Sequence, residues 1–135
     1  MLTSHPGETY IYRIEDGHTS IVYATDSEYK RVDPESTKRF IEFFQETDLL
    51  IFDAQYNFDE VLDKLDWGHS TAMMGAEFAY RAKAKRLALF HHDPTSSDDK
   101  IWAAKEQAEA YLMHQHRHHH RCQVLIAHDG LTLEL

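Results

Sequence analysis

The chain has 135 residues, of which 42% are hydrophobic and 12% aromatic, a composition that excludes a disordered tail or a collagen-like repeat. Its 14 Lys and Arg against 23 Asp and Glu give a net charge of −9, which argues against an extended nucleic-acid surface. No apolar run approaches the roughly 18 residues of a membrane span. The single cysteine, Cys122, excludes an intramolecular disulfide framework and a multi-cysteine zinc site. We expect one cytoplasmic domain over residues 1–135.

The N-terminal part of the sequence predicts a β-hairpin. Tyr10–Ile14 alternates in polarity, and Ser20–Ala24 is a β-branched and aromatic run. Asp16 and Gly17 between them are a pair typical of tight turns. A polar loop is expected over residues 25–33.

A helix and a buried strand are predicted next. Asp33 is a good N-cap and Pro34 a good first helical residue, so a helix is expected to run to about Glu46. Leu49–Phe52 is a short apolar run, typical of a strand that is buried on both faces.

The centre of the chain predicts an irregular stretch followed by another helix. Gln55–Gly68 is expected to be irregular, with one helical turn around Glu60–Lys64. Ser70 or Thr71 is a suitable cap for a helix that ends near Ala84. The alanines of this helix recur at helical spacing and predict a face that packs closely on a sheet.

The last part of the chain predicts a strand, a long helix and a final hairpin. Arg86–Phe90 is strand-like, and a helix is expected over residues 98–119. The hairpin would join Gln123–Ala127 to Leu131–Leu135 across the Asp-Gly pair at 129–130. Because strands and helices alternate, the fold class is α/β, layered, with some parallel strand neighbours.

Side chains capable of chemistry follow three of the predicted strands. Asp26, Asp53 and His91 each stand just beyond a strand. Ligands and catalytic groups in α/β sheets collect at the carboxyl ends of strands. Any one of these residues alone could simply be a turn residue, but three in succession favour a shared site.

Four pieces of the sequence carry a more specific pattern. They are Tyr23–Asp26, Asp48–Tyr56, Trp67–Thr71 and Leu87–Pro94. In order and spacing they resemble the C-terminal half of the metallo-β-lactamase fold, on its phosphodiesterase and transfer-RNA-processing nuclease branch. The resemblance implies half of an αββα sandwich, with a mixed sheet and helices on one side.

The resemblance also implies residue roles. Asp26 would bridge two metal ions, and His91 would bind one of them. His69 would protonate the leaving-group oxygen, and Asp53 would orient His69 or stabilise its charge. The expected metals are zinc or manganese.

Other parts of the family's site have no counterpart in the sequence pattern. The family uses a His-x-His-x-Asp-His loop and one further histidine, and we expect this chain to begin after both. The setting of His5 gives no reason to assign it to the site. His92 and Asp93 are expected to support the site or to be ordinary loop residues. The resemblance therefore implies half an active site, whose two-metal centre forms only when the missing half is supplied.

A histidine-rich tract imitates the missing loop. Its histidines at positions 114, 116 and 118 to 120 continue the last predicted helix, where His114 and His118, and likewise His116 and His120, stand one turn apart. We interpret these residues as a polar helix end that binds transition metals adventitiously.

Two functional hypotheses remain open. The first is the C-terminal part of a two-metal hydrolase for phosphodiester-like substrates, small-molecule or nucleotide, completed by an N-terminal partner chain. The second is a non-catalytic binding or regulatory module that forms a homodimer through its uncovered sheet face. Whether the chain is an enzyme is thus left open. A receiver-like domain with Asp53 as phosphoacceptor is disfavoured, because no acidic pair follows the first strands and no lysine follows the last one.

Overall fold

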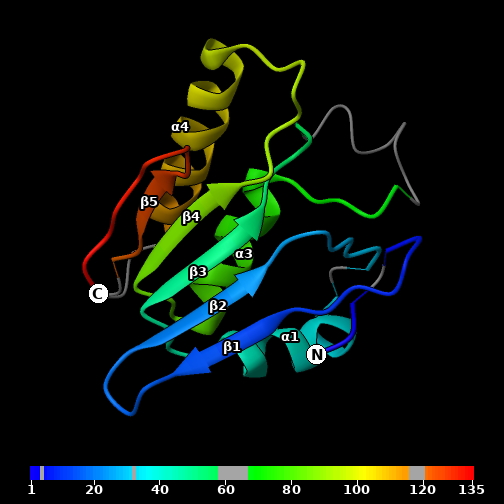
Figure 1. Ribbon diagram of the computed structural model, residues 1–135, viewed down its shortest axis with the longest axis vertical. Helices are drawn as coiled ribbons and strands as arrows, with labels where there is room; N and C mark the ends of the chain where they lie inside the picture. The colour runs from blue at the N-terminus through cyan, green and yellow to red at the C-terminus, as the bar shows by residue number, and fades with distance from the viewer. Residues whose placement is uncertain (4, 32, 58–66, 116–120) are drawn as a thin grey trace.

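The computed structural model describes residues 1–3, 5–31, 33–57, 67–115 and 121–135. The helical turn predicted around Glu60–Lys64 and the end of the last predicted helix, residues 116–119, lie outside these ranges. Within them, five strands form one mixed sheet, and the helices pack on one of its faces (Figure 1). The predicted α/β fold with helices on one side is confirmed.

The sheet has the strand order β1-β2-β3-β4-β5. The strands are β1 (Tyr12–Glu15), β2 (Ser20–Ala24), β3 (Leu49–Asp53), β4 (Arg86–Phe90) and β5 (Gln123–Ile126). β1 pairs antiparallel with β2, which confirms the predicted first hairpin, and the remaining neighbours pair in parallel. Parallel neighbours place their carboxyl ends at one edge of the sheet.

The described helices are α1 (Pro34–Phe44), α3 (Ala72–Ala82) and α4 (Asp98–Gln115). As predicted, Asp33 caps α1, because its carboxylate accepts a hydrogen bond from the Ser36 N–H. The Thr71 hydroxyl caps α3 in the same way, by accepting from the Met74 N–H. None of these helices is both long enough and apolar enough to cross a membrane.

The core lies between the sheet and the helices. In each central strand, alternate side chains face this layer and are buried. They are Val22, Ala24, Leu50, Phe52, Leu87 and Leu89. α3 packs on them through its alanines, as predicted, and through Gly75. A Cβ on Gly75 would lie 2.8 Å from Cδ1 of Phe52, so the helix approaches the sheet more closely than a side chain there would allow.

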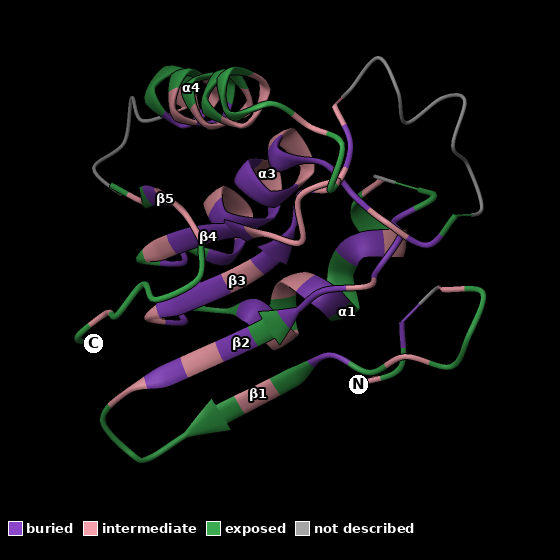
Figure 2. Ribbon diagram, turned by 45° about the horizontal axis from the view of Figure 1, so that its top comes forward, coloured by how far each residue is buried: buried purple, intermediate pink, exposed green. Residues whose placement is uncertain are grey.

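The opposite face of the sheet is only partly covered. Figure 2 shows exposed positions along β1 and β2, the edge farthest from α3 and α4. Tyr12 and Ile14 of β1 are 57% and 61% exposed, and Tyr23 of β2 is 38% exposed. We call this the open face; a protein surface seldom leaves such a row of apolar side chains in water unless something packs on it.

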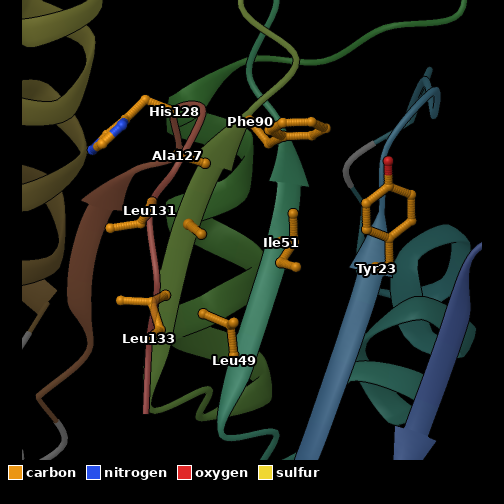
Figure 3. A pocket seen from close by; sticks show the side chains of 9 residues that line it. Tyr23, Leu49, Ile51, Phe90, Ala127, His128, Leu131 and Leu133 are labelled. Carbon is orange, nitrogen blue, oxygen red and sulfur yellow. The ribbon is translucent and has the colours of Figure 1, made fainter. Parts of the chain in front are cut away.

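The prediction of a second strand in the final hairpin is wrong. Leu131–Leu135 forms no strand and instead crosses the open face. Figure 3 shows Leu131 and Leu133 beside Leu49 and Ile51 of β3, around a hollow of about 310 Å³. The alternating leucines thus find an apolar surface rather than a strand partner. Alternation in sequence reports which side chains share a face, not whether the backbone pairs.

Candidate metal centre

The strand register places three predicted site residues at one edge of the sheet. Ala24 lies beside Phe52, and Asp53 lies beside Phe90. Asp26 and His91 follow immediately, so both leave the sheet at the level of Asp53. The three side chains predicted to share a site therefore lie together.

Asp53 organises the loops around this edge. Its side chain is fully buried, yet its carboxylate accepts four hydrogen bonds. Oδ2 accepts from the backbone N–H of Asp26 at 3.0 Å and from Nδ1 of His69 at 2.8 Å. Oδ1 accepts from the backbone N–H of Gln55 at 3.2 Å and of Ser70 at 3.1 Å. One buried charge thus fixes three loops relative to one another.

The surroundings of His69 favour the protonated form of its imidazole. Its hydrogen bond to Asp53 raises the pKa of the imidazole above its ordinary value, and this effect exceeds the opposing effect of burial. Because Nδ1 donates to Asp53, Nε2 is the nitrogen that remains for a substrate. The pair therefore has the arrangement of a general acid with an orienting carboxylate.

Asp26, which comes after β2, and His91, which comes after β4, face each other at the carboxyl ends of the strands. Oδ1 of Asp26 lies 3.2 Å from Nε2 of His91, and both side chains are about one third exposed. Two ligands of one tetrahedral metal ion, each bound at ~2.1 Å, lie about 3.4 Å apart. Both residues also have left-handed backbones, with φ of 52° and 58°, a conformation that non-glycine residues adopt mainly where the surroundings impose it.

The histidines at this edge form a compact group with the buried carboxylate. The rings of His69 and His91 stack with centroids 4.8 Å apart. Ligand atoms of Asp53, His69 and His91 all lie within 4.8 Å of one another. Nδ1 of His91 is buried and has no hydrogen-bond partner among the described residues. A buried polar atom without a partner is unusual, and it marks this edge as a place where a bound group would complete the polar contacts.

His5 is the site residue that the sequence analysis missed. Its ligand atom lies within 4.8 Å of those of Asp26 and His69. The hydroxyl of Thr9 donates to the Asp26 carbonyl at 2.9 Å, and that of Thr3 does so at 3.4 Å. These two bonds hold the loop that carries His5 against the end of β2. The Pro-Gly pair at positions 6–7 indicates a turn in this loop, but only the fold shows that it lies over Asp26.

The other described candidates, His92, Asp93 and His114, belong to neither group of ligand atoms. His92 is held against the backbone of Leu89 and Ala54, and burial lowers the pKa of its imidazole. Asp93 accepts two hydrogen bonds from Thr95 in a turn. His114 is exposed on the last turn of α4. The other tract histidines, His116, His118, His119 and His120, lie outside the described residues.

The donors present suit a divalent transition metal. Imidazole nitrogens and a carboxylate fit zinc and also manganese, and the 3.2 Å spacing of Asp26 and His91 fits a shared ion. Structural and catalytic zinc ions take about four ligands each. His5, Asp26 and His91, even with His69 and Asp53 added, are fewer than two such ions require. A complete two-metal centre would need donors from outside the described part of the chain.

Comparison with known protein families identifies the family of this chain. The model of the "Beta-lactamase superfamily domain" matches residues 1–92. The chain belongs to the beta-lactamase superfamily. It is 37% identical over 75 residues to Ribonuclease Z of Prochlorococcus marinus, a match that covers 56% of this chain and 22% of that protein. It is 34% identical over 89 residues to the probable metallo-hydrolase YhfI of Bacillus subtilis, covering 66% and 33% of the two chains.

Solved structures place this superfamily chain in the metallo-β-lactamase fold. It superposes on YhfI of Bacillus subtilis with a TM-score of 0.74 and 26% identity, over 97% of this chain and 46% of that one. It shares its fold with the short form of human tRNase Z, with a TM-score of 0.64 and 20% identity, over 98% and 39% of the chains. In each case the match spans less than half of the relative, so the expected partial correspondence to the fold is confirmed.

Proposed function

We propose that this chain carries the proton-donating half of a metal-dependent hydrolase for phosphodiester-like substrates. The observation that carries the proposal is the His69–Asp53 pair, 2.8 Å apart, inside a group of metal-ligating side chains. Two relatives named for ribonuclease or metallo-hydrolase activity match this sequence. The relatives support the reaction class, and the pair supplies the chemistry that this half contributes.

The donors at the strand ends would hold the cation. Asp26 would bind through its carboxylate, and His91 and His5 through imidazole nitrogens, with zinc or manganese as the expected metal. A bound divalent cation supplies Lewis acidity, which polarises the phosphoryl oxygen and favours ionisation of water. The one-third exposure of Asp26 and His91 leaves them accessible to a substrate from solvent.

His69 would act on the leaving group. Its Nδ1–H donates to Asp53, which fixes the ring and stabilises the protonated form. Nε2 would then deliver a proton to the departing oxygen as its bond to phosphorus breaks. Hydrogen bonds to both oxygens of Asp53 hold its carboxylate in position beside the ring.

The second half of the site would come from outside this chain. The open face, with Tyr12, Ile14 and Tyr23 exposed, matches what a second sheet would cover in an αββα sandwich. The hollow beside Leu131 and Leu133 would receive its side chains. We propose that an N-terminal half of the fold, on the same or another polypeptide in the cytoplasm, occupies this face.

A chimera tests this function. The part of YhfI that this chain does not match would be fused to the chain, and hydrolysis of bis(p-nitrophenyl) phosphate measured with Zn²⁺ or Mn²⁺. We expect metal-dependent turnover by the chimera, and none or very little by the chain alone. His69→Ala should lower kcat about 100-fold or more, whereas His18→Ala, which changes an exposed histidine in the turn between β1 and β2, should leave it unchanged. Equal activity in the Asp26→Ala, His69→Ala and unaltered chimeras would contradict the proposal.

The open face also supports a second candidate function. Two copies could cover each other's apolar face, which would make the chain a self-associating, non-catalytic module. Sedimentation of the full chain decides between the two, with Tyr23→Lys as the matched variant. A dimer that Tyr23→Lys dissociates favours the module, whereas a monomer with or without this substitution favours completion by the other half.

A further inference from the structure

Gly68 stands directly before His69 and has a demanding geometry. Its φ is +89°, in the region that favours glycine. A Cβ on Gly68 would lie 2.3 Å from Cδ2 of His5 and 2.7 Å from Cδ of Pro6. Two separate constraints therefore act at this position: the backbone conformation and the space that the His5 ring fills.

Close contact is not a general property of the left-handed glycines in this chain. Gly17 has φ +90° and Gly130 has φ +82°, but a Cβ on either would meet nothing within 4 Å. At those positions only the backbone conformation favours glycine. At Gly68 the missing side chain also makes room for an imidazole at the candidate metal centre.

The imidazole of His5 is held on Gly68 by further contacts. Its ring meets that of His69 edge to face, with centroids 5.4 Å apart. Its Nδ1 accepts a hydrogen bond from the Gly7 N–H at 3.1 Å, which fixes the orientation of the ring. The loop around it is bound to the carbonyl of Asp26 by the two threonine hydroxyls described above. The ring thus occupies one defined place between two loops.

We propose that Gly68 is a positioning residue of the candidate metal centre, because its absent side chain forms the seat that brings the His5 imidazole to Asp26 and His69. The inference rests on the proposed function in taking these side chains as metal donors, but the seat itself does not depend on it. A side chain at position 68 would displace His5 and remove one donor, while Asp26 and His91 would keep their places.

The test uses the full chain with five tract histidines changed to Gln, so that Zn²⁺ binding reports on the strand-end site; these are His114, His116, His118, His119 and His120. Gly68→Ala is compared with Gly17→Ala, which imposes similar backbone strain without the contact. We expect calorimetry to show Zn²⁺ binding 10- to 100-fold weaker in G68A and within about twofold of the parent in G17A. In metal-free protein, the NOE between the rings of His5 and His69 should disappear in G68A alone.

Repeating the Gly68→Ala substitution in a chain that already carries His5→Ala separates an effect through His5 from a general effect on folding. Because the seat acts through His5, Gly68→Ala should change Zn²⁺ affinity less than about twofold when His5→Ala is already present. Pro6→Ala removes the second close contact at Gly68, so the triple variant His5→Ala/Pro6→Ala/Gly68→Ala should fold if G68A alone does not. An unchanged NOE in G68A, equal losses of Zn²⁺ affinity in both backgrounds, or an unfolded triple variant would overturn the proposal. Loss of the NOE in G68A, with no Zn²⁺ binding by the parent, would uphold the seat and contradict the proposed function.

Discussion

The two ends of the parallel strands use similar polar residues to different effect. At the amino ends, Asp48 accepts hydrogen bonds from the Lys85 ammonium at 2.6 Å and from the Ser20 N–H at 2.8 Å. These bonds, that of Lys85 first, hold the pKa of the Asp48 carboxyl below its usual value. At the carboxyl ends, Asp26 faces His91 at 3.2 Å, and Nδ1 of His91 finds no hydrogen-bond partner in the described parts of the chain.

The difference shows how a structural cluster can be told from a functional one. Opposite charges and donors at the amino ends satisfy one another, so this cluster stabilises the fold and needs nothing more. At the carboxyl ends, ligand atoms of Asp26 lie close to those of His5 and His69 and also to Nε2 of His91. Such convergence costs stability unless a further group is bound, which is the usual condition of a site.

The largest expected effect separates Asp53, which is buried, from Asp48, which is partly exposed. Asp53→Ala should lower the free energy of unfolding by about 3–5 kcal/mol, because it leaves several buried N–H groups without an acceptor. Asp48→Ala should cost only about 1–2 kcal/mol, since its partner Lys85 is largely exposed. Urea unfolding of both variants measures the two values. Equal losses would mean that Asp53 does not hold the site loops together.

The next effect concerns metal affinity. In the chain with its tract histidines replaced, Asp26→Asn should weaken Zn²⁺ binding about 100-fold, because it replaces a carboxylate ligand at the strand ends by a neutral amide. Asp48→Asn makes the same chemical change at the opposite end and should alter affinity less than about threefold. Isothermal titration of both variants gives the comparison. Similar affinities for the two would argue against a metal site at the carboxyl ends.

A pH dependence should mark the carboxyl ends alone. The Asp53 hydrogen bond raises the pKa of His69 in the folded chain, so His69 stabilises the fold fully below its unfolded pKa of about 6.5. This contribution declines as the pH rises through the folded pKa. The loss of stability caused by His69→Gln should therefore be greater near pH 5.5 than near pH 9. Urea unfolding at the two pH values checks this, and a greater loss near pH 9 would be the opposite of what the hydrogen bond predicts.

The smallest effect is expected at the amino ends. Lys85→Met should cost less than about 1 kcal/mol, because exposed ion pairs contribute little. The pKa of Asp48 should rise toward its usual value, since Lys85 is the first cause of its depression. An NMR titration of Asp48 follows this change. A loss of Zn²⁺ affinity in Lys85→Met would contradict the expectation that the amino ends take no part in metal binding.

Much of the fold follows from local signals in the sequence. Asp33 and Thr71 cap helices, and Pro34 begins one, where the sequence predicts, because a helix start depends mainly on its near neighbours. The apolar run at Leu49–Phe52 is the central parallel strand. The segment Leu131–Leu135 was mispredicted because its partner is a surface made by β3 and β4, which no local pattern encodes.

The candidate site was predictable only in part, for a similar reason. Asp26, Asp53 and His91 follow strands, so topology alone brings them to one edge. His5 stands before the first strand and reaches this edge through the threonine bonds to Asp26 and the space over Gly68. Those contacts join segments far apart in the chain, and sequence spacing gives no measure of them.

The central claim is that the carboxyl ends of β2, β3 and β4 bind a divalent cation and the amino ends do not. The most direct test is a titration of the ¹⁵N-labelled chain, with its tract histidines replaced, by paramagnetic Mn²⁺. We predict that the amide signals of Asp26, His69 and His91 broaden first, while those of Asp48 and Lys85 remain sharp. Broadening that begins at Asp48 and Lys85, or that appears equally at both ends, would contradict the account.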